Sequence, residues 1–195
     1  MAQTWNTDLL YDLGLAMGQE YADVNNYGVY GPAMNTHRSA FAGRNFEYYS
    51  EDPIVAGRMA AGLIRGIQSN GVSACPKHFA VNSQELRRQA SNSVVDERTM
   101  RELYLTGFEI AVREAKPMSI MTSYNEVNGV YAHENKHLLQ EILRDEWGFD
   151  GMVVSDWGGS NSAVAAVKPA ARWKCRRQVS PPCASWKARS KRARS

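Results

Sequence analysis

The 195-residue sequence has few cysteines and no long apolar segment. Its three cysteines, Cys75, Cys175 and Cys183, are too few and too scattered for a disulfide framework or a zinc site. No run approaches the roughly 20 apolar residues of a membrane span, so no membrane partner is expected. The N-terminus also lacks the basic and apolar stretches of a signal peptide. The compartment is therefore not specified, and the cytoplasm is the default expectation.

Acidic residues are missing from the C-terminal segment. Residues 168–195 hold ten Lys and Arg but no Asp or Glu, whereas the whole chain has 23 basic and 20 acidic residues. Residues 1–167 therefore keep 13 basic and 20 acidic residues, a net charge of −7. Such asymmetry indicates either a nucleic-acid-binding arm or a segment foreign to the domain. We divide the chain into a domain, 1–167, and a basic tail, 168–195.

Strand-like and helical patterns alternate along the domain. Short apolar strands are expected near residues 27, 72, 119 and 151, with amphipathic helical patterns before and between them. The first helix is expected from Thr4 to Ala22, and Asp52-Pro53 and Asp96 are typical helix starts. This order predicts βαβ units and a parallel sheet. The predicted fold class is α/β, a partial (β/α)8 TIM-type barrel truncated at both ends, because a whole barrel needs about 250 residues.

The segment 151–159 carries the strongest signal of a site. Met152 to Val154 form an apolar run typical of a buried parallel strand, and Asp156 follows directly. Barrel enzymes build their sites at the carboxyl ends of strands, which makes Asp156 a catalytic candidate. On position alone, a cap on the next helix or a bond to a loop amide is an equally good explanation.

The other strands and loops deliver further polar and aromatic groups to the same edge of the sheet. The candidates are Arg44, Lys77, His78, Met121, Tyr124 and Trp157. Each alone could serve core packing or a surface ion pair. Their recurrence at successive strand ends favours a site, and such a set suits a neutral polyol, because charged groups bind hydroxyls and aromatic faces cover sugar rings. No glycine-rich phosphate-binding loop is present.

Four motifs carry a family resemblance. Gly43–Pro53, Lys77–Phe79, Met121–Asn125 and Val154–Gly158 closely resemble glycoside hydrolase family 3, in particular its β-glucosidases. The similarity covers residues 4–167 in the family's order and spacing. It implies hydrolysis of terminal non-reducing β-D-glucosyl residues, with a β-glucoside or oligosaccharide as substrate and no metal or organic cofactor.

The resemblance also assigns roles to the candidates. Asp156 matches the nucleophile of a retaining mechanism, which forms a covalent glycosyl-enzyme. Tyr124 matches the tyrosine beside that nucleophile. The remaining matches are sugar-hydroxyl ligands, Arg44, Lys77 and His78, and walls of the sugar pocket, Met121 and Trp157.

The sequence departs from the family pattern in three places. It begins partway into the barrel, no residue matches an upstream sugar-binding Asp, and the acid/base carboxylate of the family lies in a later domain. Retaining hydrolysis needs two carboxylates, so this chain is expected to have little activity alone. The alternative is a non-catalytic sugar-binding remnant.

The family pattern stops after Val167. Lys168 to Cys175 can be encoded by a set of codons that also has a second reading. When the reading frame starts at the third base of the first codon, these codons encode Thr-Gly-Gly-Glu-Val-Glu-Met. Family members carry a similar segment at this place. We therefore interpret residues 168–195 as a frameshifted and disordered tail that binds no nucleic acid. The alternative is a genuine basic arm for nucleic acid.

Overall fold

A computed structural model describes residues 1–167. The tail, 168–195, and the hypotheses attached to it lie outside the described residues. Within the described part, helices and parallel strands alternate as the sequence predicts.

The main strands pair in sequence order, and every pair is parallel. β1 pairs with β2, and an isolated bridge from Ala33 to Lys77 carries that pairing on to β3, which pairs with β5, as β5 does with β8. Among the described residues β1 and β8 do not pair, so the strands form an open arc. The strands are β1 (Gly28–Val29), β2 (Ser73–Ala74), β3 (Lys77–Phe79), β5 (Ser119–Thr122) and β8 (Met152–Ser155).

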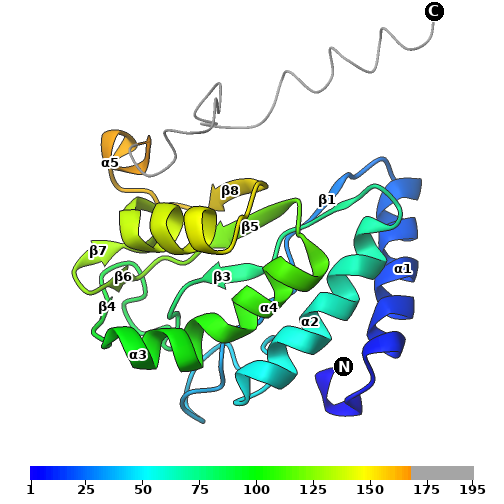
Figure 1. Ribbon diagram of the computed structural model, residues 1–195, viewed down its shortest axis with the longest axis horizontal. Coiled ribbons are helices and arrows are strands. Elements are labelled where there is room, and N and C mark those ends of the chain that lie inside the picture. Colours follow the sequence, from blue (N-terminus) through cyan, green and yellow to red (C-terminus); the bar gives the residue numbers. More distant parts are fainter. Residues whose placement is uncertain (168–195) are drawn as a thin grey trace, which may run out of the picture.

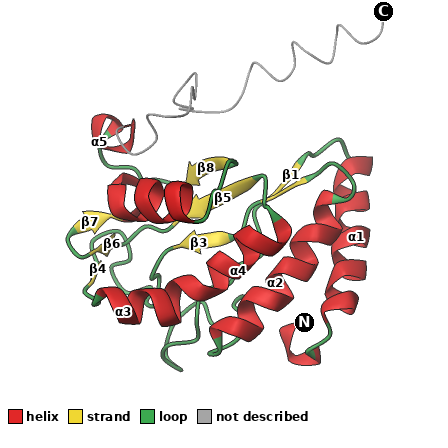
Figure 2. Ribbon diagram, viewed as in Figure 1, coloured by secondary structure: helices red, strands yellow, loops and turns green. Residues whose placement is uncertain are grey.

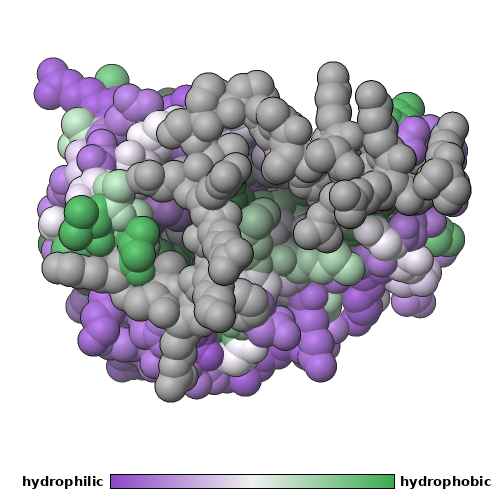
Figure 3. Space-filling model, turned by 90° about the horizontal axis from the view of Figure 1, so that it is seen from above, coloured by the Kyte–Doolittle hydropathy of each residue, from purple (hydrophilic) through white to green (hydrophobic). Residues whose placement is uncertain are grey.

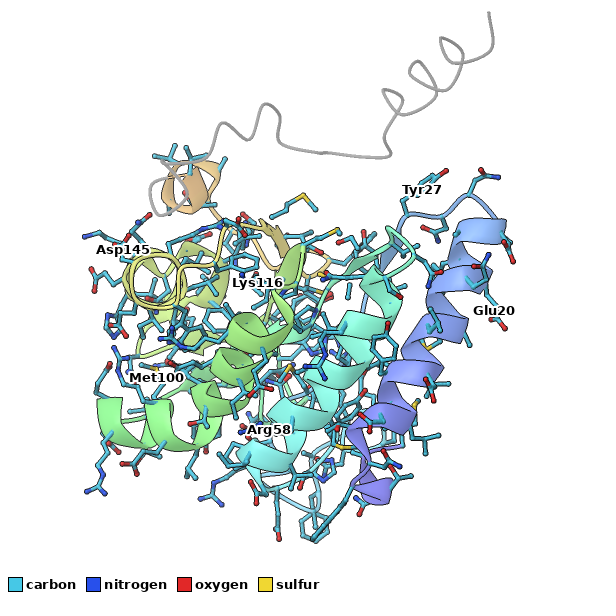
Figure 4. All side chains as sticks on the ribbon, turned by 45° about the vertical axis from the view of Figure 1, so that its right-hand side comes forward. Glu20, Tyr27, Arg58, Met100, Lys116 and Asp145 are labelled. Carbon is cyan, nitrogen blue, oxygen red and sulfur yellow. The ribbon has the colours of Figure 1, made fainter. Side chains whose placement is uncertain are left out.

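Helices cover one face of this arc. Figure 1 shows α4, α2 and α1 side by side as a layer in front of the strands, and Figure 4 shows Glu20 of α1 at the outer edge of that layer. The helices are α1 (Thr7–Asp23), α2 (Pro53–Gln68), α3 (Glu97–Thr99), the π-helix η2 (Met100–Leu105), α4 (Thr106–Ala115), the π-helix η4 (His137–Glu146) and α5 (Ala163–Val167), with 3-10 turns η1 (Ala2–Thr4) and η3 (Ala132–Glu134).

Side-chain caps set the starts of α1, α2 and α3. The Asp52 carboxylate accepts hydrogen bonds from the amides of Ile54 and Val55, with Pro53 in the first turn, as the sequence predicts. The predicted start of α1 at Thr4 is wrong, because the Asn6 side chain caps the helix and α1 begins three residues later. Asp96 caps α3 through the amide of Thr99.

Glycines allow α1 and α2 to pack in direct backbone contact. A Cβ on Gly66 of α2 would overlap the carbonyl oxygen of Tyr11 and lie 2.7 Å from the Leu15 nitrogen. A Cβ on Gly14 of α1 would likewise overlap the carbonyl oxygen of Leu63. The two helices therefore approach more closely than any side chain at these positions would permit.

A second, smaller sheet lies where the sequence predicts only loops. β4 (Asn92–Ser93) runs parallel to β6 (Glu126–Val127), and β6 runs antiparallel to β7 (Val130–Tyr131). Figure 2 shows this sheet beyond the carboxyl ends of β3 and β5. The prediction of a loop from Asn125 to Tyr131 is therefore wrong in part, because strands of two residues are too short to show an alternating pattern.

The core lies between the helix layer and the arc of strands. Phe79 is completely buried, and its ring packs edge-on against those of Phe108 and Trp147 with centroids 5.4 and 5.9 Å away. Cys75 is buried beside this core as a free thiol. Where the described residues are visible in Figure 3, hydrophilic residues surround a more hydrophobic centre. No helix within residues 1–167 combines the length and apolar character needed to cross a membrane.

Candidate active site

Asp156 and three other predicted site residues meet at the carboxyl ends of the strands. Asp156 directly follows β8, where its amide donates to the Thr122 carbonyl of β5. Its Oδ2 lies 3.5 Å from His78 Nε2 and 3.9 Å from Arg44 Nη1. Tyr124 is the fourth member, through its hydroxyl. Residues from three different loops and strands thus converge on one carboxylate.

Asp156 makes the loop-amide contact that the sequence offered as an alternative to a catalytic role. Its Oδ1 accepts a hydrogen bond of 2.7 Å from the amide of Trp157, which is the loop-amide contact. It does not cap α5, since the amide of Ala165 in that helix bonds the hydroxyl of Ser162. The second oxygen, Oδ2, faces the site, and the side chain is only 13% exposed. A carboxylate held by one oxygen keeps the other oriented for chemistry.

Arg44 and Lys77 are joined by Glu47, a residue that we did not single out from the sequence. Arg44 Nε donates to Glu47 Oε1, and Lys77 Nζ lies 3.7 Å from Glu47 Oε2. Burial by itself lowers the pKa of Arg44, but the hydrogen bond to Glu47 and the neighbouring charges raise it above its usual value. Arg44 is therefore a permanent cation. The signal for Glu47 was its place inside the Gly43–Pro53 motif, three residues after Arg44.

His78 is a neutral, fully positioned imidazole. Asn35 accepts from the His78 amide at 2.7 Å and donates to its carbonyl at 2.8 Å, and the Tyr48 hydroxyl lies 3.4 Å from Nδ1. Burial, followed by the charges of Arg44, Lys77 and Arg88, lowers the pKa of His78 to about 2. If Nδ1 of the neutral ring accepts from the Tyr48 hydroxyl, the ring proton is on Nε2, the nitrogen that lies 3.5 Å from Asp156 Oδ2.

The buried His78 should make stability depend on pH. Its folded pKa lies below the ordinary value of about 6.5, so the unfolded state takes up the proton first and stability falls as pH drops from about 6.5 toward about 2. Between pH 7 and pH 5 the loss due to His78 should be about 2 kcal/mol. In urea unfolding at both pH values, His78→Gln should reduce the difference by that amount. The same difference in both proteins would contradict a neutral His78.

Tyr124 is buried next to Asp156 and under an arginine. Burial, then the charge of Asp156 and a hydrogen bond to it, raise the pKa of Tyr124. The guanidinium carbon of Arg88 lies 4.3 Å from the centre of the tyrosine ring. The phenol therefore stays protonated and can donate to the carboxylate.

Met121 and Trp157 differ in exposure. Met121, in the central strand β5, pairs with Lys77 on one side and Val154 on the other, and it is 3% exposed. Trp157 is 70% exposed, with its ring edge-on to Tyr30 at a centroid distance of 5.8 Å. Met121 thus underlies the site, whereas Trp157 stands at its rim.

A cavity of about 600 Å³ opens beside Lys77. Its lining combines side chains near the site with others from α1 and α2: Tyr30, Glu47, Tyr48, Lys77, Met17, Tyr21, Leu63 and Ile67. Asp156 does not line it, so the site is defined by the side-chain cluster and not by this cavity. Within residues 1–167, no three His, Cys, Asp or Glu side chains are grouped closely enough to hold a metal ion.

A carboxylate surrounded by polar side chains at the carboxyl ends of parallel strands is the arrangement typical of (β/α)-barrel domains. Comparison with known proteins supplies the family. The family model described as glycosyl hydrolase family 3 N terminal domain matches residues 1–178, and the chain belongs to this family.

Named relatives agree with that membership. The chain is 53% identical over 159 residues to beta-glucosidase A of Butyrivibrio fibrisolvens. The matched region covers 82% of this chain and 19% of the relative. It is 48% identical over 167 residues to thermostable beta-glucosidase B of Acetivibrio thermocellus, covering 86% and 22%. The chain therefore spans about a fifth of the length of these relatives.

Solved structures confirm the α/β barrel class. Beta-glucosidase 3B from Thermotoga neapolitana in complex with α-D-glucose superposes with a TM-score of 0.85 at 49% identity, covering 86% of this chain and 24% of that one. Beta-glucosidase from Kluyveromyces marxianus in complex with glucose gives the same TM-score at 45% identity, covering 86% and 20%.

Proposed function

We propose that this chain contributes the nucleophile and part of the sugar-binding site of a retaining β-glucosidase. One observation carries the proposal: Asp156 Oδ2 is turned toward His78 and Arg44 at the carboxyl ends of the strands. Membership of the family and the names of the relatives support the same reaction. Two of the solved neighbours are complexes with glucose, which supports glucose as the sugar bound.

In the proposed reaction Asp156 attacks the anomeric carbon of a terminal β-D-glucosyl residue. The leaving alcohol departs through an oxocarbenium-like transition state, and water then hydrolyses the glycosyl-enzyme with overall retention. Arg44, Lys77 and the neutral His78 would hydrogen-bond sugar hydroxyls, while Met121 and Trp157 would bound the ring. No metal or organic cofactor takes part in this scheme.

The proton donor must come from outside the described residues. Retention requires a second carboxyl group roughly 5–5.5 Å from the nucleophile. The carboxylates that pair with Arg44 besides Asp156, Glu47 and Glu85, are both engaged by further cations: Glu47 by Lys77 and Glu85 by Arg88 at 2.9 Å. A carboxyl group paired with cations is a poor acid, because the cations favour its ionised form. The same fact favours a second candidate, a sugar-binding protein without turnover.

Hydrolysis of a 4-nitrophenyl β-D-glucoside by the complete gene product tests the proposal. We expect turnover, with β-glucose as the first product observed by proton NMR, and weak or no turnover by the 195-residue chain alone. The matching β-xyloside and β-galactoside measure the preference for glucose. Release of α-glucose first would contradict retention, and glucose binding without hydrolysis would favour the sugar-binding alternative.

A further inference from the structure

The loop between β3 and β4 presents charged side chains to the site, and the proposed reaction gives them no role. Glu85 Oε1 lies 3.9 Å from Arg44 Nη1, and its Oε2 accepts a hydrogen bond of 2.9 Å from Arg88 Nη1. A Cβ on Gly43 would lie 3.2 Å from the Glu85 side chain, so the two loops are in close contact. Charges thus alternate from Arg88 through Glu85 and Arg44 to Asp156.

Arg88 also covers the face of the Tyr124 ring. Its guanidinium carbon lies 4.3 Å from the ring centre, within the range of an attractive cation–π contact. The Arg88 side chain is 39% exposed, whereas Tyr124 is 4% exposed, so the arginine forms the outer wall over a buried phenol. The neighbouring Arg87 is exposed and lines the same side of the loop.

The position of Arg88 affects the hydroxyl at the other end of the ring. A cation over the face of a phenol withdraws electron density from it, which makes the hydroxyl a stronger hydrogen-bond donor. Asp156 lies close enough to that hydroxyl for its negative charge to raise the pKa of Tyr124. Because Glu85 fixes the guanidinium, the ring has one preferred orientation beneath it.

We propose that Arg88, held by Glu85, is a positioning residue that keeps the Tyr124 hydroxyl directed at Asp156. Arg88 acts through the tyrosine, and the ion pairs of the described residues join it to Glu85 and not to Asp156. This inference rests on the proposed function, since Asp156 must be the nucleophile for the orientation to affect catalysis. During the second half of the reaction the hydroxyl would stabilise the carboxylate as the glycosyl bond breaks and the charge returns to Asp156.

A double-mutant cycle in the complete gene product tests the kinetic side of this inference. Arg88→Met, which keeps the length of the side chain and removes its charge, should lower kcat about tenfold with little change in KM. Arg88→Lys should restore part of the loss, and Arg87→Met is the control that should leave both constants unchanged. In a Tyr124→Phe background, Arg88→Met should lower kcat less than twofold. An equal loss in both backgrounds, or a change confined to KM, would overturn the inference.

An NMR measurement on the 195-residue chain tests the contact without any turnover. Tyrosines are labelled with ¹³C at Cζ, and the Tyr124 signal is identified by its loss in Tyr124→Phe. Arg88→Met should shift that signal, whereas Arg87→Met should not. If the chemical shift of the Tyr124 signal is the same in Arg88→Met as in the wild type, the inference is overturned, even if the enzyme hydrolyses glucosides. Absence of hydrolysis by the complete gene product, with the NMR shift present, would instead contradict the proposed function.

Discussion

Asp156→Asn should lower kcat of the complete gene product by at least about a thousandfold, or about 4 kcal/mol of transition-state stabilisation. The amide has nearly the shape of the carboxylate and can still accept from the Trp157 amide, so the loop should keep its conformation. It lacks the negative charge that attacks the anomeric carbon. Steady-state kinetics with an aryl β-glucoside, combined with a glucose-binding measurement, separates loss of chemistry from loss of binding.

Asp150→Asn is the matched control. Asp150 is an exposed carboxylate at the opposite end of β8, in the loop that precedes the strand. Its replacement should leave kcat within about twofold, because it is remote from the carboxyl end of the strand. Wild-type turnover in the Asp156→Asn protein would show that another residue is the nucleophile.

Gly66→Ala should destabilise the chain by about 3 kcal/mol or more, the upper end of the effect of overpacking a core. The new Cβ would meet the backbone of Tyr11 and Leu15, and backbone cannot move aside as a flexible side chain can. The helices α1 and α2 would have to separate, which would open the core at Leu10 and Ile67.

Urea unfolding followed by tryptophan fluorescence measures this effect. Gly28→Ala provides the comparison, because a Cβ at Gly28 would meet no atom within 4 Å. We expect its midpoint to change little, whereas that of Gly66→Ala should fall well below the wild-type value. Equal midpoints for the two variants would mean that α1 and α2 do not pack through Gly66.

The alternation of strands and helices was predictable because its signals are local. Asp52-Pro53 starts α2 through two hydrogen bonds to the Asp52 side chain, and the apolar run at Met152 to Val154 forms most of β8. The same local information gave the places of Arg44, His78 and Asp156, since each follows or lies in a recognisable segment. Their convergence followed from the rule that parallel strands present their carboxyl ends at one edge.

Features that depend on tertiary contacts were not predictable. Glu85 gains its importance from the cations of Arg44 and Arg88 that folding brings near it, and nothing in its immediate sequence distinguishes it from a surface acid. Arg88 reaches Tyr124 across 36 positions of the sequence. The need for glycine at position 66 likewise depends on a tertiary contact, the close packing of α1 against α2.

The most direct test of the account is to trap the covalent intermediate. The complete gene product is incubated with 2,4-dinitrophenyl 2-deoxy-2-fluoro-β-D-glucoside, whose leaving group departs without a proton donor, and the labelled peptide is sequenced by mass spectrometry. We predict a single 2-fluoroglucosyl group on Asp156, absent from Asp156→Asn. A label on Glu47, Glu85 or any other residue, or time-dependent hydrolysis of the reagent with no label at all, would contradict the assignment of Asp156 as the nucleophile.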